Sequence, residues 1–199
     1  MKNIHLKSIL LGIIGILLVG FGAGMLTKTG YGADTLNAAF TGISAKTNLS
    51  LGTINTIFNA VFIIVIFFVD RKLVGIGMIL SVFILKFPID FAMSIYPASP
   101  NIFVGFLSDV LSLSIFAFGA ALMIESKMGA TVYDGITLIL TDRTKLSFRT
   151  VRFICDGTAL FLGVLLHGQI GMGTVLSFAL MAPLIDMFRK MINKGVGYN

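Results

Sequence analysis

Six stretches of the chain are apolar over the length that a helix needs to cross a lipid bilayer. Such a crossing takes about 20 mostly apolar residues. The stretches are residues 8–26, 51–69, 73–95, 102–124, 148–166 and 170–188. Of the 199 residues, 56% are hydrophobic and only 12% are charged, which is more apolar surface than one soluble core can bury. The sequence therefore predicts an all-α membrane protein with one integral domain over residues 1–199, and it excludes soluble enzymes, nucleic-acid-binding domains and disordered chains.

The basic charge of the chain is explained by membrane topology. Because Lys and Arg gather in the cytoplasmic loops of multi-pass proteins, the net charge of +6 predicts no nucleic-acid partner. The single cysteine, Cys155, excludes an intramolecular disulfide and a cysteine metal cluster. No nucleophile–base set, zinc motif or P-loop is present in the sequence, so we expect no enzyme activity, no metal and no cofactor.

Two further segments, residues 34–45 and 130–141, are too short to cross a bilayer and too apolar to be plain loops. In each of them, apolar residues fall on one helical face and polar residues on the other. This spacing predicts a re-entrant or interfacial helix. Tyr31, Tyr96 and Tyr133 are expected at the membrane interfaces.

The chain also contains an internal repeat. Residues 21–70 align with 118–167, and residues 73–90 align with 169–186 after a slip of one residue. The order of elements is the same in both halves: span, short helix, span, span. Many identities are polar residues or glycines, which apolar bias does not explain: Gly32/Gly129, Thr47/Thr144, Ser50/Ser147, Thr53/Thr150, Gly75/Gly171, Gly77/Gly173 and Asp90/Asp186.

Three crossings in each half require the two halves to insert in opposite directions. With the N-terminus in the cytoplasm, the predicted outer segments hold only Lys28 and Lys46, and Lys86 lies within a span. The other Lys and Arg residues then fall on the cytoplasmic side. We therefore predict two inverted three-span repeats, at about 8–95 and 102–190, in the inner (plasma) membrane with both termini cytoplasmic.

Several stretches are similar to one family of bacterial membrane proteins. The chain resembles the YczE/YyaS/YitT family, in particular its YczE-like branch, from about Gly12 to Ile185. The resemblance implies the multi-pass fold, while the family has no well-established activity and transport is a common suggestion. One departure is that Ala33 and Ala130 stand where a proline is often found. The most specific matching pieces are Asp134-Gly135, Arg149-x-x-Arg152-x-x-x-Asp156 and Gly171-x-Gly173-Thr174.

Ionisable residues within the spans are candidate functional groups, because each costs roughly 2.5–3.5 kcal/mol at membrane depth. Toward the outer side, Lys86 and Asp90 are one helical turn apart, and Asp109 on the next span is within reach of Lys86. This set is consistent with a structural ion pair, with a substrate or ion site, or with a lysine that snorkels to the interface.

Toward the inner side, Arg152 and Asp156 are also one turn apart, and the repeat aligns them with Asn55 and Asn59. A charged pair opposite an amide pair is what a transporter site between two repeats could contain. The alternative is that Arg152 snorkels to the cytoplasm and Asp156 neutralises it.

Asp34 and Asp134 lie near the starts of the two short helices, where a carboxylate stabilises a helix N-terminus. They could instead line a central cavity. The predicted substrate-binding residues are Asn59, Lys86, Asp90, Asp109, Asp134, Arg152 and Asp156.

The leading functional hypothesis is a small-solute secondary transporter that works by alternating access between the inverted halves. Its partners would be the lipid bilayer, an unknown small solute and, because the chain is short, a second copy in a homodimer. One alternative is the substrate-capture subunit of an energy-coupled vitamin transporter. Another is a non-transporting regulatory membrane protein, in which the intramembrane charges only hold the helix register.

Overall fold

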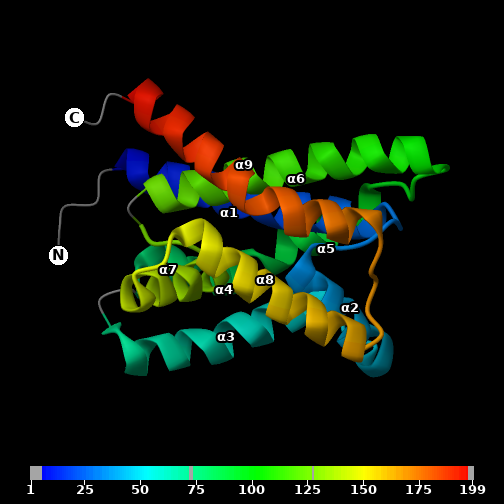
Figure 1. Ribbon diagram of the computed structural model, residues 1–199, viewed down its shortest axis with the longest axis horizontal. Coiled ribbons are helices and arrows are strands. Elements are labelled where there is room, and N and C mark those ends of the chain that lie inside the picture. Colours follow the sequence, from blue (N-terminus) through cyan, green and yellow to red (C-terminus); the bar gives the residue numbers. More distant parts are fainter. Residues whose placement is uncertain (1–5, 72–73, 127, 197–199) are drawn as a thin grey trace.

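The computed structural model describes residues 6–71, 74–126 and 128–196, and those residues form helices and no strand. The helices pack into one bundle (Figure 1). Their bounds are α1 Leu6–Lys28, α2 Thr35–Thr47, α3 Leu51–Val69, α4 Ile76–Ile84, α5 Lys86–Ile95, α6 Ile102–Glu125, α7 Val132–Thr144, α8 Phe148–Leu165 and α9 Met172–Val196.

Among the residues that the structure describes, four segments are long and apolar enough to cross a membrane, by length and composition. They are Ser8–Lys28, Leu51–Val69, Ile76–Ile95 and Ile102–Glu125. The predicted spans at 148–166 and 170–188 also form helices, α8 and α9, but these two are more polar. The all-helical, membrane-like class predicted from hydropathy is therefore confirmed.

The predicted span at 73–95 is interrupted. Leu85 separates α4 from α5, although its backbone stays near helical values. Pro88 explains the interruption, because it has no N–H to donate to the carbonyl of Ile84 and its ring crowds that carbonyl.

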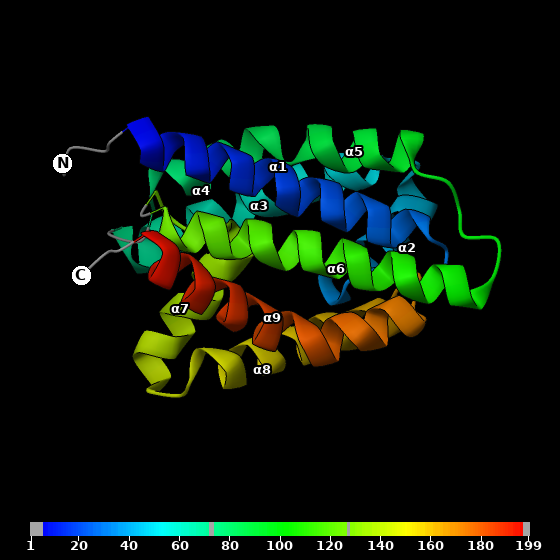
Figure 2. The same cartoon turned by 90° about the horizontal axis from the view of Figure 1, so that it is seen from above.

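The two short segments form helices of 13 residues each, α2 and α7, at opposite ends of the bundle (Figure 2). Asp34 is the N-cap of α2, and Thr131 is the N-cap of α7. Both helices end on a residue with positive φ, Asn48 at 57° and Lys145 at 59°. These termini occupy equivalent positions in the alignment of the repeat.

Helices α1 and α6 lie side by side in opposite directions (Figures 1 and 2). Their contact is backbone against backbone. A Cβ atom added at Gly22 would lie 2.8 Å from the carbonyl oxygen of Ser112, and one at Gly119 would lie 2.8 Å from that of Gly15. Small residues allow this close approach.

The loops before the two short helices make a second pair of equivalent contacts. The carbonyl of Met128, before α7, accepts a 2.8 Å hydrogen bond from the N–H of Gly77 on α4. The carbonyl of Tyr31, before α2, accepts a 2.9 Å hydrogen bond from the N–H of Gly173 on α9. The loop before α7 is thus anchored to the first turn of α4, and the loop before α2 to the first turn of α9.

Replacing Gly22 or Gly119 with alanine is expected to lower the thermal unfolding temperature of the detergent-solubilised protein, by similar amounts. Each new Cβ would lie 2.7 Å from a backbone nitrogen of the facing helix. Overpacking of this kind costs about 1–3 kcal/mol. Gly157→Ala on α8 is the matched control, since the nearest atom would be 3.8 Å away. An equal loss in the control would contradict the interpretation.

Candidate functional site

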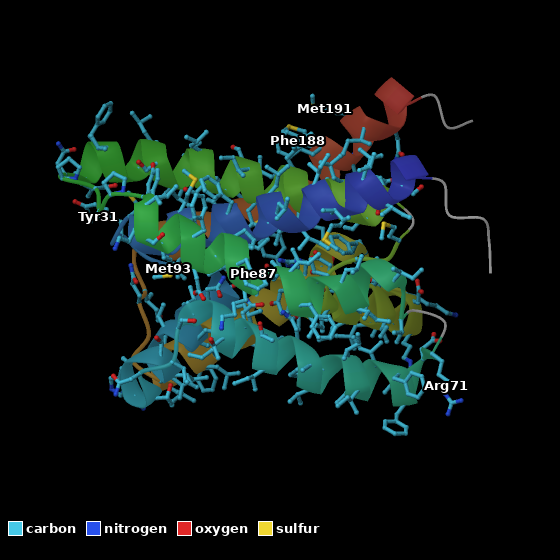
Figure 3. The ribbon with its side chains drawn as sticks, turned by 180° about the vertical axis from the view of Figure 1, so that it is seen from behind. Tyr31, Arg71, Phe87, Met93, Phe188 and Met191 are labelled. Carbon is cyan, nitrogen blue, oxygen red and sulfur yellow. The ribbon has the colours of Figure 1, made fainter. Side chains whose placement is uncertain are left out.

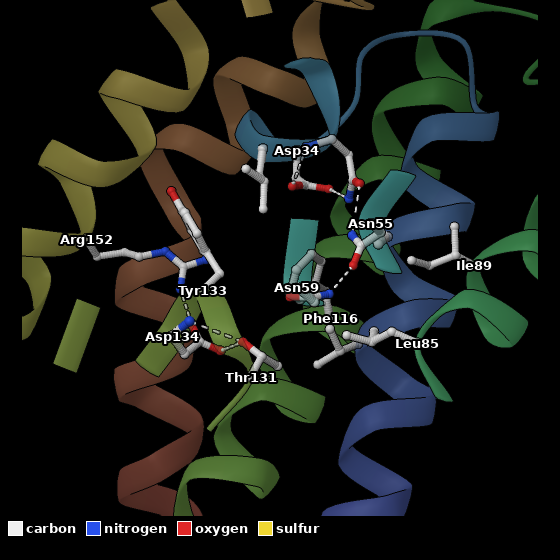
Figure 4. Close-up of a pocket in the computed structure, with 14 residues that line it drawn as sticks. Asp34, Asn55, Asn59, Leu85, Ile89, Phe116, Thr131, Tyr133, Asp134 and Arg152 are labelled. Atoms are coloured by element: carbon white, nitrogen blue, oxygen red, sulfur yellow. Dashed lines mark hydrogen bonds and ion pairs between the residues drawn. The ribbon is translucent and has the colours of Figure 1, made fainter. Parts of the chain in front are cut away.

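A cavity of about 40 Å³ lies at the centre of the bundle, between the N-termini of α2 and α7 (Figure 4). Apolar side chains of α1, α5 and α6 form one wall, among them Val19, Ile89 and Phe116. The polar residues that line the cavity are Asp34, Asn37, Asn55, Asn59, Thr131, Tyr133, Asp134 and Arg152.

One set of hydrogen bonds connects the start of α2 to α3, and we call it the amide chain. The carboxylate of Asp34 accepts from the backbone N–H of Asn37 at 3.2 Å and from its side-chain amide at 2.5 Å. Asn55 donates to Asn37 at 3.5 Å, and Asn59 donates to Asn55 at 2.5 Å. The amide chain thus consists of Asp34, Asn37, Asn55 and Asn59.

A second set connects the start of α7 to α8, and we call it the charged chain. The hydroxyl of Thr131 donates to Asp134 at 2.8 Å and accepts from its backbone N–H at 3.2 Å. Arg152 contacts Asp134 through Nη1 and donates from Nε to Asp156 at 3.2 Å. The charged chain consists of Thr131, Asp134, Arg152 and Asp156.

The two chains occupy equivalent positions in the sequence repeat. Aligned in order, Asp34, Asn37, Asn55 and Asn59 correspond to Thr131, Asp134, Arg152 and Asp156. The predicted equivalence of an amide pair and a charged pair thus extends to two complete hydrogen-bonded chains. In Figure 4 they approach the cavity from opposite sides.

Asp156 joins the two ends of the bundle. Its carboxylate accepts from the hydroxyl of Thr35 on α2 at 2.9 Å and from that of Tyr133 on α7 at 2.8 Å. The Arg152 guanidinium lies 4.6 Å from the centre of the Tyr133 ring. The interfacial position predicted for Tyr133 is therefore wrong, because its hydroxyl is used by a buried carboxylate.

The charges of the site are almost completely buried. Asp34, Asp134, Asp156 and Arg152 are each 2–5% exposed. The two carboxylates of the charged chain share the one guanidinium, so each has a charged partner. Asp34 forms no ion pair with any residue that the structure describes, and burial raises the pKa of its carboxyl. Arg152 does not snorkel, since its head group faces two carboxylates inside the bundle.

Of the three interpretations of Lys86, the ion pair is not formed: among the described residues, Lys86 pairs with neither Asp90 nor Asp109. Asp90 instead binds the start of α3, where its carboxylate accepts from the hydroxyl of Ser50 at 2.9 Å and from the N–H of Gly52 at 3.0 Å. The first N–H groups of a helix have no partner within the helix, which explains why Asp90 binds the start of α3 and not Lys86.

Asp109 lies apart from the cavity, near the start of α9. It is fully buried, and its Oδ1 accepts a 2.8 Å hydrogen bond from Thr29. Its Oδ2 has no hydrogen-bond partner among the described residues. A Cβ at Gly173, in the first turn of α9, would lie 2.8 Å from that oxygen, so the positive end of the α9 dipole faces it.

The structure thus brings together four of the seven substrate-binding residues predicted from the sequence: Asn59, Asp134, Arg152 and Asp156. Sequence reasoning missed Asn37, Thr131 and Tyr133 as lining residues. The repeat alignment contained a signal for two of these, because Asn37 aligns with Asp134 and Thr131 with Asp34. Tyr133 aligns with Leu36 and carries no such signal.

Comparisons with known proteins place the chain among bacterial relatives. The Family of unknown function (DUF6198) matches residues 6–190. An "Uncharacterized protein" of Haemophilus influenzae is 24% identical over 186 residues, which cover 94% of this chain and 85% of the relative. The "Uncharacterized protein YyaS" of Bacillus subtilis is 25% identical over 186 residues, covering 91% and 92%. These matches confirm the resemblance to the YyaS-like family. No solved structure matches the chain.

Arg152→Gln is expected to lower the free energy of unfolding by about 3–5 kcal/mol, because it leaves Asp134 and Asp156 buried without a cation. Adding Asp134→Asn and Asp156→Asn should recover much of this loss, since the charged chain then becomes a second amide chain. Thermal unfolding in detergent measures both effects. Arg149→Gln, at an exposed position on α8, is the control and should change little. A triple variant no more stable than Arg152→Gln would contradict this account.

Proposed function

The chain belongs to the Family of unknown function (DUF6198), and from its geometry we propose that it is a small-solute secondary transporter. The single observation that carries the proposal is the cavity between two equivalent polar chains, at the N-termini of two short helices. Sites of this kind, at the interface of two repeats, are typical of alternating-access transporters. The proposal assigns the protein no catalytic chemistry.

We propose six crossings, with α8 and α9 as the fifth and sixth. Helix α8 has 18 residues and is about 27 Å long, close to the thickness of a bilayer core. Its polar residues Arg152 and Asp156 point inward, while Ile154, Phe161 and Leu165 are more than half exposed. An apolar outer face over a polar inner face suits a helix that lies between lipid and a polar site.

Reciprocal contacts support two inverted halves. The approach of Gly22 to Ser112 on α6 is matched by the approach of Gly119 to Gly15 on α1. The backbone hydrogen bonds that anchor α2 and α7 are matched in the same way. Since α2 and α7 lie at opposite ends of the bundle (Figure 2), a two-fold axis in the membrane plane would relate the halves.

The two ends of the bundle differ, which is what one state of an alternating-access cycle requires. At the α2 end, helix α2 packs directly on the backbone of α8, and a Cβ at Gly42 would lie 2.5 Å from the carbonyl oxygen of Leu166. Gln169 seals this end with hydrogen bonds to Thr41 at 2.7 Å and to the carbonyl of Thr27 at 2.9 Å. We propose that this end is the closed gate.

At the α7 end, bulky side chains replace the glycine contacts. Gly163 of α8 also packs on α2, where a Cβ would lie 3.3 Å from the backbone nitrogen of Ala39. Ile139 of α7 and Ile66 of α3 occupy the positions that align with Gly42 and Gly163, and they pack in one apolar cluster. Side chains therefore make the contact between α7 and α3, and Arg143 of α7 donates a 3.3 Å hydrogen bond to the carbonyl of Val69 at the end of α3. In our proposal, this is the end that closes when the α2 end opens.

The distribution of charge supports cytoplasmic termini. Arg71 points away from the bundle at the end where α9 finishes (Figure 3). The exposed Arg143, Lys145 and Arg149 lie in and around the α7–α8 turn at that end. Basic residues of a multi-pass protein concentrate on the cytoplasmic side, so we propose that this end faces the cytoplasm in the inner (plasma) membrane.

Cysteine labelling tests the orientation. On a Cys155→Ser background, Ser99→Cys is expected to react with a membrane-impermeant maleimide added to intact cells. Lys145→Cys is expected to react only after permeabilisation, because it lies in the α7–α8 turn. The reverse pattern would overturn the proposed orientation, and labelling of both positions in intact cells would overturn the six-span topology.

Flux in proteoliposomes tests transport. The purified protein should move at least one solute from a metabolite panel, and Asp156→Asn should slow that flux at least tenfold, because Asp156 connects α2, α7 and α8. Asp142→Asn, an exposed acid on α7, is the control and should leave flux unchanged.

The absence of flux for every solute would overturn the transport proposal. Tight binding without flux would then favour the substrate-capture subunit, and the absence of any binding would favour a regulatory protein.

A further inference from the structure

The acids at the central cavity outnumber the bases. Asp34, Asp134 and Asp156 are within or next to it, and Arg152 is the one cation there among the described residues. A buried charge is costly unless it is paired. A further positive charge in the cavity would therefore stabilise the site. We propose that the cavity binds a small organic cation with N–H donors, an ammonium group, which pairs with Asp34. This inference rests on the proposed function and names its substrate class.

Asp34 is the carboxylate at the cavity that forms no ion pair with any described residue. Both of its oxygens accept hydrogen bonds, at 3.2 and 2.5 Å, but both bonds come from the neutral Asn37. The other two carboxylates already share Arg152. Asp34 lines the cavity directly (Figure 4), so a cation in the cavity can reach it without disturbing the charged chain.

Asn59 supplies an acceptor at the other end of the amide chain. Its side chain is 4% exposed and lines the cavity. Its amide nitrogen donates to Asn55, while its Oδ1 accepts no hydrogen bond from any residue that the structure describes. An acceptor on a residue that lines the cavity, with no donor among the described residues, can accept a hydrogen bond from a ligand or from water. Asp34 and Asn59 therefore offer a charge and an oxygen to the same N–H-bearing group.

An anion fits the cavity poorly, although two helix N-termini face it. The N-terminus of α2 is already occupied by the Asp34 carboxylate, and that of α7 by the hydroxyl of Thr131. An anion would also lie among three carboxylates, and the guanidinium of Arg152 is already shared by two of them. Like charges at low dielectric repel strongly.

The size of the cavity restricts the cation further. About 40 Å³ accommodates a few water-sized groups. The apolar wall of Val19, Ile89 and Phe116 suits a short alkyl substituent. Methylammonium meets these requirements, whereas tetramethylammonium has the same charge but no N–H donor and a larger volume.

Thermal unfolding of the purified full-length protein in detergent tests the inference at constant ionic strength. Methylammonium chloride is expected to raise the unfolding temperature by several degrees, because a ligand that binds only the folded state stabilises it. Tetramethylammonium chloride and sodium acetate should raise it much less. Titration should give a dissociation constant at least tenfold weaker for Asp34→Asn and for Asn59→Ala than for the unaltered protein.

Asn caps a helix about as well as Asp, so Asp34→Asn should fold normally. Asp142→Asn removes an exposed acid of α7 and should keep the full methylammonium response. The inference is overturned if methylammonium stabilises no more than tetramethylammonium, if acetate stabilises as much, or if Asp34→Asn retains the full shift.

Binding and flux separate this inference from the transport proposal. Methylammonium binding without flux of any solute would overturn transport and leave the cation site intact. Flux of neutral or anionic solutes without methylammonium binding would overturn the cation site alone.

Discussion

The contact of Arg152 with two carboxylates holds together the part of the bundle on which the central cavity depends. Asp134 comes from the start of α7 and Asp156 from α8, and all three side chains are almost completely buried. Such a group is tolerated only when every charge has a partner. Because Asp156 also accepts from Thr35 on α2, one buried network determines where both short helices lie relative to α8.

Close backbone packing provides the frame for this network. In the proposed membrane setting, there is no water to form hydrogen bonds with backbone groups, and the hydrophobic effect contributes little to helix association. Close packing of small residues and internal hydrogen bonds therefore hold the helices together. The glycines between α1 and α6 allow these two helices to touch. The hydrogen bonds of Gly77 and Gly173 then hold the loops that lead into α7 and α2. Both short helices consequently begin beside the cavity.

Much of the fold, and part of the site, could be predicted from residue patterns. The segments at 34–45 and 130–141 became α2 and α7, since their amphipathic spacing is a local property. Arg152 and Asp156 met as predicted because a spacing of four residues puts them on one face of α8. The same spacing failed for Lys86 and Asp90. Residue spacing shows which side chains share a helix face, but it does not show which other groups can bind them. The Asp90 carboxylate accepts hydrogen bonds from the start of α3 and not from Lys86.

Hydropathy and capping residues are properties of neighbouring positions, so the sequence by itself determined the helices and the membrane-like class. It also aligned Asn55 and Asn59 with Arg152 and Asp156. Only the tertiary structure decided which polar groups meet. Thr35 and Asp156 are 121 positions apart, and nothing local links them. Buried polar groups pair according to how distant helices approach one another. The packing of α7 on α8 placed Arg152 beside Asp134 and Asp156, and it left Asp34 without an ion pair among the described residues.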